Sequence, residues 1–205
     1  MEPDAVEIRV LGCLVEKQRT TPDVYPLTLN ALRLACNQST NRDPVVDYDE
    51  NTIRGAIERL VQRKWATLAS WSNRRSMKYR HTLDGAVGLD DGEISILAVL
   101  MLRGPQTPGE LKARTERLHR FGDMEELGGT LDRLIERSLV GRLERRPGQR
   151  EERYEQLLGE APAGEEREEI APAPEPEGVD RLAQLERELA DLREEVRSLR
   201  QELGA

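Results

Sequence analysis

The apolar positions of residues 5–36 recur at the three- and four-residue spacing of amphipathic helices. We expect a first helix over residues 5–18, with an apolar face made of Ile8, Leu11, Leu14 and Val15. A turn follows, and Pro26 is suited to begin a second helix because its missing N–H is not needed in the first turn. The expected apolar face of this second helix is Leu27, Ala31, Leu34 and Ala35.

A third helix and a hairpin complete the same unit. The polar loop of residues 38–48 leads to Asp49, which can cap a helix whose core-facing side chains are Ile53, Ile57, Leu60 and Val61. Two short strands are expected over residues 66–71 and 76–82. Three helices followed by a hairpin is the order of a winged helix, which is a variant of the helix-turn-helix.

The order recurs in residues 89–158. Ile94, Leu97 and Leu100 match Ile8, Leu11 and Leu14 at a constant offset of 86, and Arg133, Leu134 and Arg137 match Arg59, Leu60 and Arg63 at an offset of 74. An internal repeat indicates duplicated architecture more strongly than the propensities of either copy. Thr107 and Glu110 form a capping box, and strands are expected over residues 139–143 and 152–156. Only Gly128 and Gly129, inside the third helix, oppose this assignment, at about 1 kcal/mol each.

The tail has a different pattern. Residues 159–178 are an acidic, proline-rich stretch with too little apolar content to fold, and we interpret them as a linker. Residues 179–205 carry a heptad seam of seven apolar side chains: Leu182, Leu185, Leu189, Leu192, Val196, Leu199 and Leu203. In a parallel pair the flanking charges form attractive contacts, which are Arg181–Glu186, Glu188–Arg193 and Glu195–Arg200. This pattern predicts a parallel homodimer, with a higher oligomer or a single helix folded back on the domains as alternatives.

The expected fold is therefore mainly α-helical with small β-hairpins. It comprises a first winged-helix domain (residues 1–88), a second one (89–158), a linker (159–178) and a coiled-coil helix (179–205). The acidic N-terminal residues do not resemble a signal peptide, and the longest apolar run, residues 94–102, is too short to span a bilayer. We expect a cytoplasmic protein with no membrane partner.

The net charge of −8 comes from the tail. Residues 1–88 hold 13 basic and 11 acidic residues, residues 89–158 hold 12 and 14, and residues 159–205 hold 6 and 14. A nearly neutral globular part neither supports nor excludes a nucleic-acid partner, so the clustering of basic residues decides.

Basic residues cluster on the third helix of the first domain and on its hairpin. The outer face of that helix carries Gly55, Glu58, Arg59 and Gln62, flanked by Arg54 and Arg63. His81 adds to a basic hairpin that has no acid between Trp71 and Leu83. The expected nucleic-acid-binding residues are Arg54, Arg59, Gln62, Arg63, Arg74, Arg75, Lys78 and Arg80. A solvated face of mixed charge remains an equal alternative for the helix. Trp65 is expected in the core, and Trp71 at the core edge or against a partner.

Catalytic and metal-binding patterns are absent from the sequence. Cys13 lies among apolar residues as a small buried side chain, and Cys36 has no base beside it in sequence. His81 and His119 are isolated, and with the two cysteines they give no zinc-ligand spacing. We expect a protein that is not an enzyme and that needs no metal or cofactor.

Several motifs together resemble those of the YceH-like family of bacterial proteins. They are T-T-P-D-V-Y-P-L-T-L-N-A-L with A-C-N-Q-S-T-N-R-D-P (residues 20–44), M-K-Y-R-H (77–81), R-G-P-Q-T-P-G-E-L (103–111) and R-P-G-Q-R-E-E-R-Y (146–154). The resemblance covers residues 5–158 and implies a tandem winged-helix fold with a DNA-binding role. The family is itself uncharacterised, so it supplies no catalytic residues.

Two hypotheses follow from different functional classes. The first is a dimeric DNA-binding protein, of the kind that regulates transcription, which uses the third helix and the basic hairpin of the first domain. The second is a protein-interaction adaptor built on tandem winged helices, without DNA binding. The neutral globular part and the acidic helix face of the second domain favour the adaptor, and the basic hairpin favours DNA.

Overall fold

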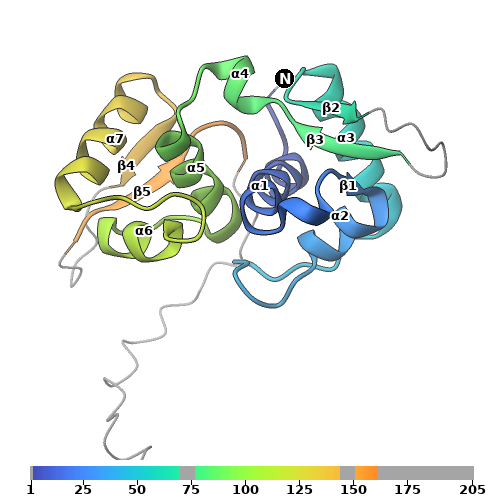
Figure 1. The fold of residues 1–205 in the computed structure, drawn as a ribbon, viewed down its shortest axis with the longest axis horizontal. Helices are drawn as coiled ribbons and strands as arrows, with labels where there is room; N and C mark the ends of the chain where they lie inside the picture. The colour runs from blue at the N-terminus through green and yellow to red at the C-terminus, as the bar shows by residue number, and fades with distance from the viewer. Residues whose placement is uncertain (1, 70–76, 144–150, 161–205) are drawn as a thin grey trace, which may run out of the picture. The chain divides into compact units, whose positions relative to one another are not determined.

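The protein combines α-helices with two small antiparallel sheets (Figure 1). The computed structural model describes residues 2–69, 77–143 and 151–160, and these belong to one compact unit, Met1–Gly164. The sequence-based expectation of helices with small hairpins is confirmed at this level. The coiled-coil segment and most of the linker lie outside the described residues.

The first copy consists of three helices and a three-stranded sheet. Its sheet has the order β1-β3-β2, with Leu27 opposite Tyr79 and Leu68 also opposite Tyr79. The elements, in chain order, are α1 (Ala5–Thr20), the 3-10 helix η1 (Pro22–Val24), β1 (Leu27–Thr28), α2 (Leu29–Cys36), α3 (Glu50–Gln62), β2 (Ala66–Ala69) and β3 (Lys78–His81).

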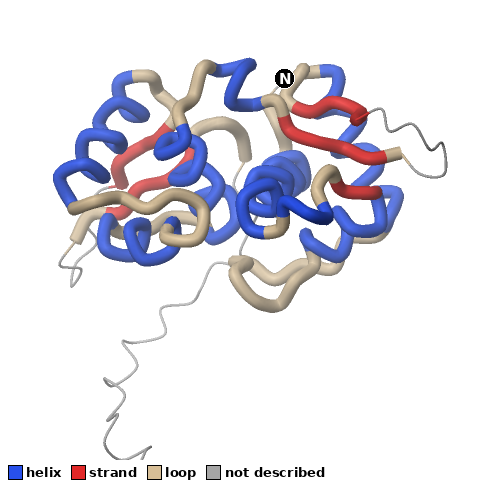
Figure 2. The backbone as a smooth tube through the Cα atoms, viewed as in Figure 1, coloured by secondary structure: helices blue, strands red, loops and turns tan. Residues whose placement is uncertain are grey.

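The second copy repeats this order after a short connecting helix. In its sheet β4 pairs with β5, and a single bridge from Gln106 to Tyr154 takes the place that β1 has in the first copy. The strands of the two copies lie on opposite sides of the central helices (Figure 2). The elements are α4 (Leu83–Val87), α5 (Asp91–Arg103), α6 (Pro108–Thr115), α7 (Met124–Glu136), β4 (Val140–Leu143) and β5 (Arg153–Gln156).

The expected helix caps are confirmed. Asp49 accepts a hydrogen bond from the backbone N–H of Thr52 at 2.7 Å, and Thr107 with Glu110 forms the reciprocal capping box that begins α6. Gly128 and Gly129 do lie inside α7, and a Cβ at either position would meet nothing within 4 Å. Packing therefore does not require glycine at these two positions.

The second helix begins later than expected. Leu27 and Thr28 pair with Tyr79 and Lys78 as β1, and the Thr28 hydroxyl caps α2 by accepting from the backbone N–H of Ala31. Pro26 therefore does not begin the helix. The displaced start changes the buried face: Leu32 is fully buried, whereas Leu34 is 56% exposed and does not belong to the apolar face.

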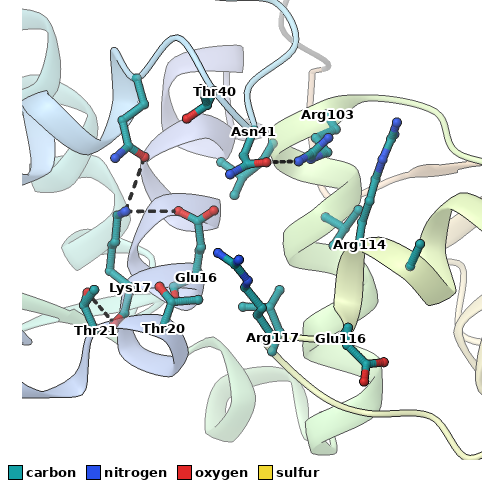
Figure 3. Close-up of a pocket in the computed structure, with 15 residues that line it drawn as sticks. Glu16, Lys17, Thr20, Thr21, Thr40, Asn41, Arg103, Arg114, Glu116 and Arg117 are labelled. Carbon is teal, nitrogen blue, oxygen red and sulfur yellow. Dashed lines mark hydrogen bonds and ion pairs between the residues drawn. The ribbon is translucent and has the colours of Figure 1, made fainter. Parts of the chain in front are cut away.

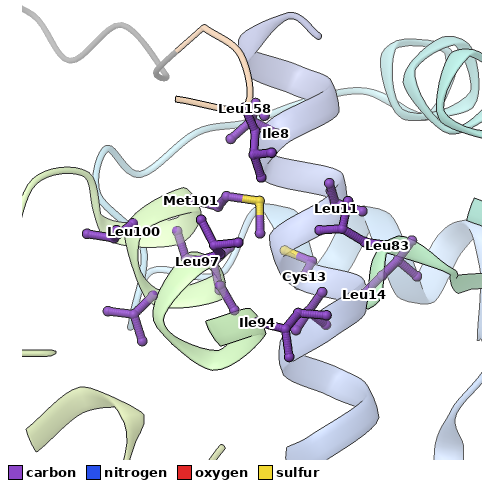
Figure 4. Close-up of a cluster of buried hydrophobic side chains, with 14 of the residues drawn as sticks. Ile8, Leu11, Cys13, Leu14, Leu83, Ile94, Leu97, Leu100, Met101 and Leu158 are labelled. Atoms are coloured by element: carbon purple, nitrogen blue, oxygen red, sulfur yellow. The ribbon is translucent and has the colours of Figure 1, made fainter. Parts of the chain in front are cut away.

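The two copies share one hydrophobic core, and α1 and α5 lie side by side within it (Figure 1). α1 is buried continuously from Glu7 to Val15, and α5 from Gly92 to Leu102. Figure 4 shows apolar side chains of both helices meeting around Cys13 and Met101. A helix that is buried on all sides must be covered by more than its own domain, so each copy completes the core of the other.

Gly12 sets the distance of closest approach between α1 and α5. A Cβ at this position would lie 3.0 Å from Leu102 and 3.1 Å from Met101. Real Cβ atoms are rarely this close to other atoms, so any larger residue must displace α5 side chains.

The loop between α2 and α3 also joins the copies. The backbone N–H of Asp43 donates to the carbonyl of Leu102 in α5 at 2.9 Å. Arg42 is buried and donates to the carbonyl of Ala35 at 3.0 Å and to both carboxylate oxygens of Glu16. The polar Asn-Arg-Asp-Pro segment of this loop (residues 41–44) therefore has a structural role, which is to fix the loop against α1 and α5. Within the described residues, no helix combines the length and apolar character that a bilayer crossing needs.

We predict that Gly12→Val lowers the free energy of unfolding by about 2 kcal/mol, because the added methyl groups overpack the contact between α1 and α5. Urea denaturation followed by circular dichroism measures this change. The matched control is Gly129→Val, on the exposed side of α7, which should change stability by less than about 0.5 kcal/mol. Equal effects of the two substitutions would contradict close packing at Gly12.

Candidate nucleic-acid interface

A groove of about 380 Å³ lies where three elements of the first copy meet. α2 contributes its N-terminal residues Leu29 and Asn30, α3 contributes Glu50 and Arg54 from its first turns, and β3 lies beside them with Tyr79. Met77, at the start of β3, also lines the groove and is 62% exposed. The groove therefore brings the expected contact residue Arg54 close to Met77 and Tyr79 at the base of the hairpin, while Lys78 and Arg80 are not part of its lining.

Strand alternation orients the basic residues of β3. Successive side chains of a strand point to opposite faces, so Lys78 and Arg80 share one face, while Tyr79 and His81 share the other. Tyr79 and His81 are buried, and Arg80 is exposed. Lys78 lies opposite both Thr28 and Ala69 in the sheet. The expected basic residues of the described part of the hairpin thus face away from the core.

The expectation that His81 adds to the basic hairpin is wrong. Its side chain is buried and its ring contacts the Gln18 amide. Burial lowers the pKa of His81 to about 4, so the ring is neutral at physiological pH. Alternation along β3 places it in the core, and it therefore carries no charge toward a phosphate.

Arg54 and Gln62 are accessible on α3. Arg54 forms an ion pair with Glu50 one turn earlier, at 2.6 Å, and both side chains are about half exposed. Exposed pairs of this kind contribute little to stability, so Arg54 can exchange Glu50 for another anion at low cost. Gln62 is exposed at the end of α3. Arg74, Arg75 and Trp71 lie outside the described residues, and Trp65 packs against the core with part of its surface exposed.

Arg59 and Arg63 have acceptors within the protein. The Arg59 Nε donates to Glu7 at 3.0 Å, its Nη2 pairs with Asp4, and the Arg63 Nε donates to the other oxygen of Glu7 at 3.0 Å. Asp4 and Glu7 also form the capping box of α1. We call this set the first acid–arginine cluster, and it fastens α3 to the start of α1. The DNA-binding role of Arg59 and Arg63 stays a prediction, but both guanidinium groups are already engaged.

The second copy repeats the cluster at the equivalent positions. Asp90 and Glu93 form the capping box of α5, and Glu93 is buried. Arg133 pairs with Asp90 at 3.0 Å, and Arg137 pairs with Glu93 at 3.1 Å. We call this the second acid–arginine cluster. The sequence signal for both clusters is an Asp-x-x-Glu at an offset of 86 together with Arg-x-x-x-Arg at an offset of 74.

Opposing effects act on the carboxyl group of Glu7. Burial raises its pKa, but hydrogen bonds from Arg59, the Asp4 backbone and Arg63 outweigh burial, so the pKa lies below its ordinary value of 4.5. A lowered pKa in the folded state means that the ionised cluster stabilises the fold above that ordinary value. This contribution is lost as the pH falls through the lowered pKa.

We predict that Glu7→Gln lowers the free energy of unfolding by about 2 kcal/mol at neutral pH, because two arginines lose a charged acceptor. The difference between this variant and the wild type should shrink as the pH falls through the lowered pKa of Glu7, where Glu7 itself becomes protonated. Urea denaturation across this pH range measures both effects. Glu58→Gln, at an exposed position of α3, is the control and should match the wild type. A constant gap at every pH would contradict the role of the charge.

Comparison with known proteins places the chain in a family. A family model described as "Protein of unknown function, DUF480" matches residues 4–149. The "UPF0502 protein" of Pelobacter propionicus is 46% identical over 201 residues, which cover 95% of this chain and 91% of that protein. The "UPF0502 protein" of Opitutus terrae is 46% identical over 191 residues, with 92% and 82% covered. The resemblance to YceH-like bacterial proteins is thereby confirmed, and the chain belongs to the DUF480 family, whose bacterial members include these UPF0502 proteins.

Proposed function

We propose that this protein binds duplex DNA through its first copy, as a cytoplasmic homodimer of the kind that regulates transcription. The observation that carries the proposal is the groove of the first copy, where the start of α2, the first turns of α3 and the base of the basic hairpin meet. Helix-turn-helix proteins place these same elements against DNA, with one helix in the major groove and basic side chains on phosphates.

The proposal includes a finer description of the fold, in which each copy is a winged helix. The order of three helices and a hairpin supports this, and β1 supplies the short third strand of the sheet in the first copy. In this description α3 is the recognition helix and the segment between β2 and β3 is the wing. Arg74 and Arg75 belong to that segment of the sequence.

The contact residues can be ranked by the partners that they already have. Arg54 exchanges a weak surface pair for a phosphate or a base edge, and Arg80 is exposed on the outward face of β3. Gln62 is exposed and can read a base edge. Arg59 and Arg63 serve the first acid–arginine cluster, and we assign them a structural role in place of direct DNA contact.

The charge on the third helix differs between the two copies and favours the first copy for DNA binding. The outward residues of α7 include Glu125, Asp132 and Glu136. Arg133 on this helix and Arg137 at its C-cap belong to the second acid–arginine cluster. Acidic side chains repel phosphates, so the second copy contributes to the structure and not to recognition.

Dimerisation through the tail belongs to the same proposal. The heptad seam from Leu182 to Leu203 and its three attractive charge pairs support a parallel coiled coil. A dimer doubles the phosphate contacts of the first copy. We propose no catalytic step, since both cysteines are buried and the contact residues above are those of a binding surface.

A protein-interaction adaptor is the second candidate. Large apolar side chains are exposed on the first copy, and such residues support protein contacts when they form a patch. They include Val24, Leu34, Val45, Leu68 and Met77. Two results together would decide for this candidate. A pull-down with this protein as bait would recover one stoichiometric protein partner, and the protein itself would show no affinity for DNA.

We predict that replacing Arg74, Arg75 and Lys78 by alanine weakens binding to a fluorescent DNA duplex. Each phosphate contact releases counterions from the DNA, so the loss of three contacts makes binding less dependent on salt. The magnitude of the slope of log affinity against log salt should decrease by about 2 to 3. Fluorescence anisotropy at several salt concentrations measures both quantities. The control removes the same charge from the second copy, through alanine at Lys112, Arg117 and Arg120. No detectable binding of wild-type protein at low salt would overturn the proposal.

We predict opposite consequences for two arginines of α3. Arg54→Ala should weaken DNA binding about tenfold and leave stability unchanged, since the ion pair that Arg54 forms with Glu50 is exposed. Arg59→Ala should lower the free energy of unfolding by about 2 kcal/mol, because it leaves the buried Glu7 with fewer partners. The folded Arg59 variant should bind DNA as the wild type does. Anisotropy and urea denaturation of both variants test the assignment, and an exchange of the two phenotypes would refute it.

We predict that a variant ending at Gly178 is a monomer in sedimentation-velocity ultracentrifugation, while the full chain is a dimer. The truncation leaves the core of the described unit unchanged, so the circular dichroism of its helices should be retained apart from the tail. A truncated protein that keeps the oligomeric state of the full chain would show that the tail is not the cause of dimerisation.

A further inference from the structure

A second cavity, of about 690 Å³, lies at the junction of the two copies. One side is formed by the C-terminal part of α1 and by residues of the loop that joins α2 to α3. The other side is formed by the end of α5 and by α6 with the turn that follows it. Its size is that of a site for a small organic molecule, and it is separate from the groove proposed for DNA.

Cations outnumber anions in the lining of this cavity. Lys17, Arg103, Arg114 and Arg117 line it, against the carboxylates of Glu16 and Glu116. Figure 3 shows Lys17 and Glu16 on α1 facing Arg103 and Arg117 from the second copy. Both copies therefore contribute positive charge to one enclosed space.

Both carboxylates are already paired with arginines that do not line the cavity. Glu16 is held by the buried Arg42, with Nη2 at 2.6 Å and Nη1 at 3.0 Å. Glu116 pairs with Arg120 at 3.2 Å. Because these partners offset the two negative charges, the cavity has an excess of positive charge that its own acids do not balance.

The cations of the lining have weak or no partners. Lys17 donates to the Gln38 amide at 3.3 Å and forms a long ion pair of 3.7 Å with Glu16, whose carboxylate Arg42 holds more closely. Arg103 donates to the Asn41 amide, which is a neutral acceptor. Arg114 shares Glu110 with Arg153, at 3.4 and 3.1 Å. Within the described part of the chain, Arg117 has neither an ion pair nor a side-chain hydrogen bond.

The environment of Arg103 agrees with an unbalanced positive site. Burial lowers the pKa of Arg103, and the positive charge of Arg114 lowers it further. An anion between these side chains would relieve their mutual repulsion, and it would do so in a partly enclosed site where charge interactions are stronger than in water.

We propose that this cavity binds a small organic phosphate, with Arg103, Arg114 and Arg117 as its phosphate ligands and Lys17 as a further positive contact. Guanidinium groups form paired hydrogen bonds to phosphate oxygens, and three of them belong to the lining of this cavity. Val99, Leu102 and Leu118 supply apolar surface for the organic part of the ligand. The bound molecule would join α1 of the first copy to α6 of the second. The inference does not depend on DNA binding.

The test is isothermal titration calorimetry of the full chain with inorganic pyrophosphate as the probe, at fixed ionic strength. Wild-type protein should bind one pyrophosphate per chain, and Arg117→Ala should weaken binding about tenfold or more, because a charge-assisted contact is lost. Arg117 is exposed and has no partner in the described residues, so this variant should fold. Lys112→Ala removes a cation from α6, the helix that precedes Arg117, outside the lining, and should bind as the wild type does.

Three results would overturn the inference: no binding of pyrophosphate, equal weakening by Arg117→Ala and Lys112→Ala, or tighter binding of citrate than of pyrophosphate. A DNA duplex that competes with pyrophosphate for the wild type would also overturn it, since the positive charge would then serve a nucleic-acid backbone. The variant with alanine at Arg74, Arg75 and Lys78 should keep full pyrophosphate affinity. That result separates this site from the proposed DNA surface, whether or not DNA binds.

Discussion

The packing of α1 against α5 is the contact on which the rest of the structure depends. Each helix is buried on all sides over most of its length, so neither copy could cover its own first helix alone. Gly12 permits the close approach, and the backbone of Asp43 adds a hydrogen bond from the first copy to α5. The shared core has a functional consequence. The groove of the first copy and the cavity at the junction belong to one compact unit, so their side chains are held by the same framework.

The two acid–arginine clusters show how a repeated motif can resemble a binding surface. In both copies a buried glutamate from a capping box forms ion pairs with two arginines at the third helix of that copy. A basic residue on such a helix is usually considered for DNA contact, yet these four arginines fasten the third helix to the first. Under the proposed DNA-binding function, the candidate contact residues of the first copy are a smaller set, centred on Arg54, Gln62 and the outward face of β3.

Hydrophobic spacing was sufficient to predict the main helices and the pairs of strands that follow them, but not the short helix α4. Asp49 and the pair Thr107 and Glu110 were recognisable as caps because capping depends on a few adjacent residues. The start of α2 was not predictable in this way, because the pairing of Leu27 with Tyr79 joins residues that are far apart in the sequence. The same limitation applies to His81, whose burial depends on strand register, and to the partners of Arg59. The Asp-x-x-Glu and Arg-x-x-x-Arg repeats were visible, but only the packing of α3 on α1 shows that they meet.

The central claim is that the first copy alone provides the DNA-binding surface. Hydrogen exchange measured by mass spectrometry, on the full chain with and without a random-sequence duplex at low salt, tests it most directly. DNA should slow exchange in peptides that cover the start of α2, the first turns of α3 and the β2–β3 hairpin, and leave those of α7 and the β4–β5 hairpin unchanged. Protection confined to the second copy, or equal in both copies, would contradict the account.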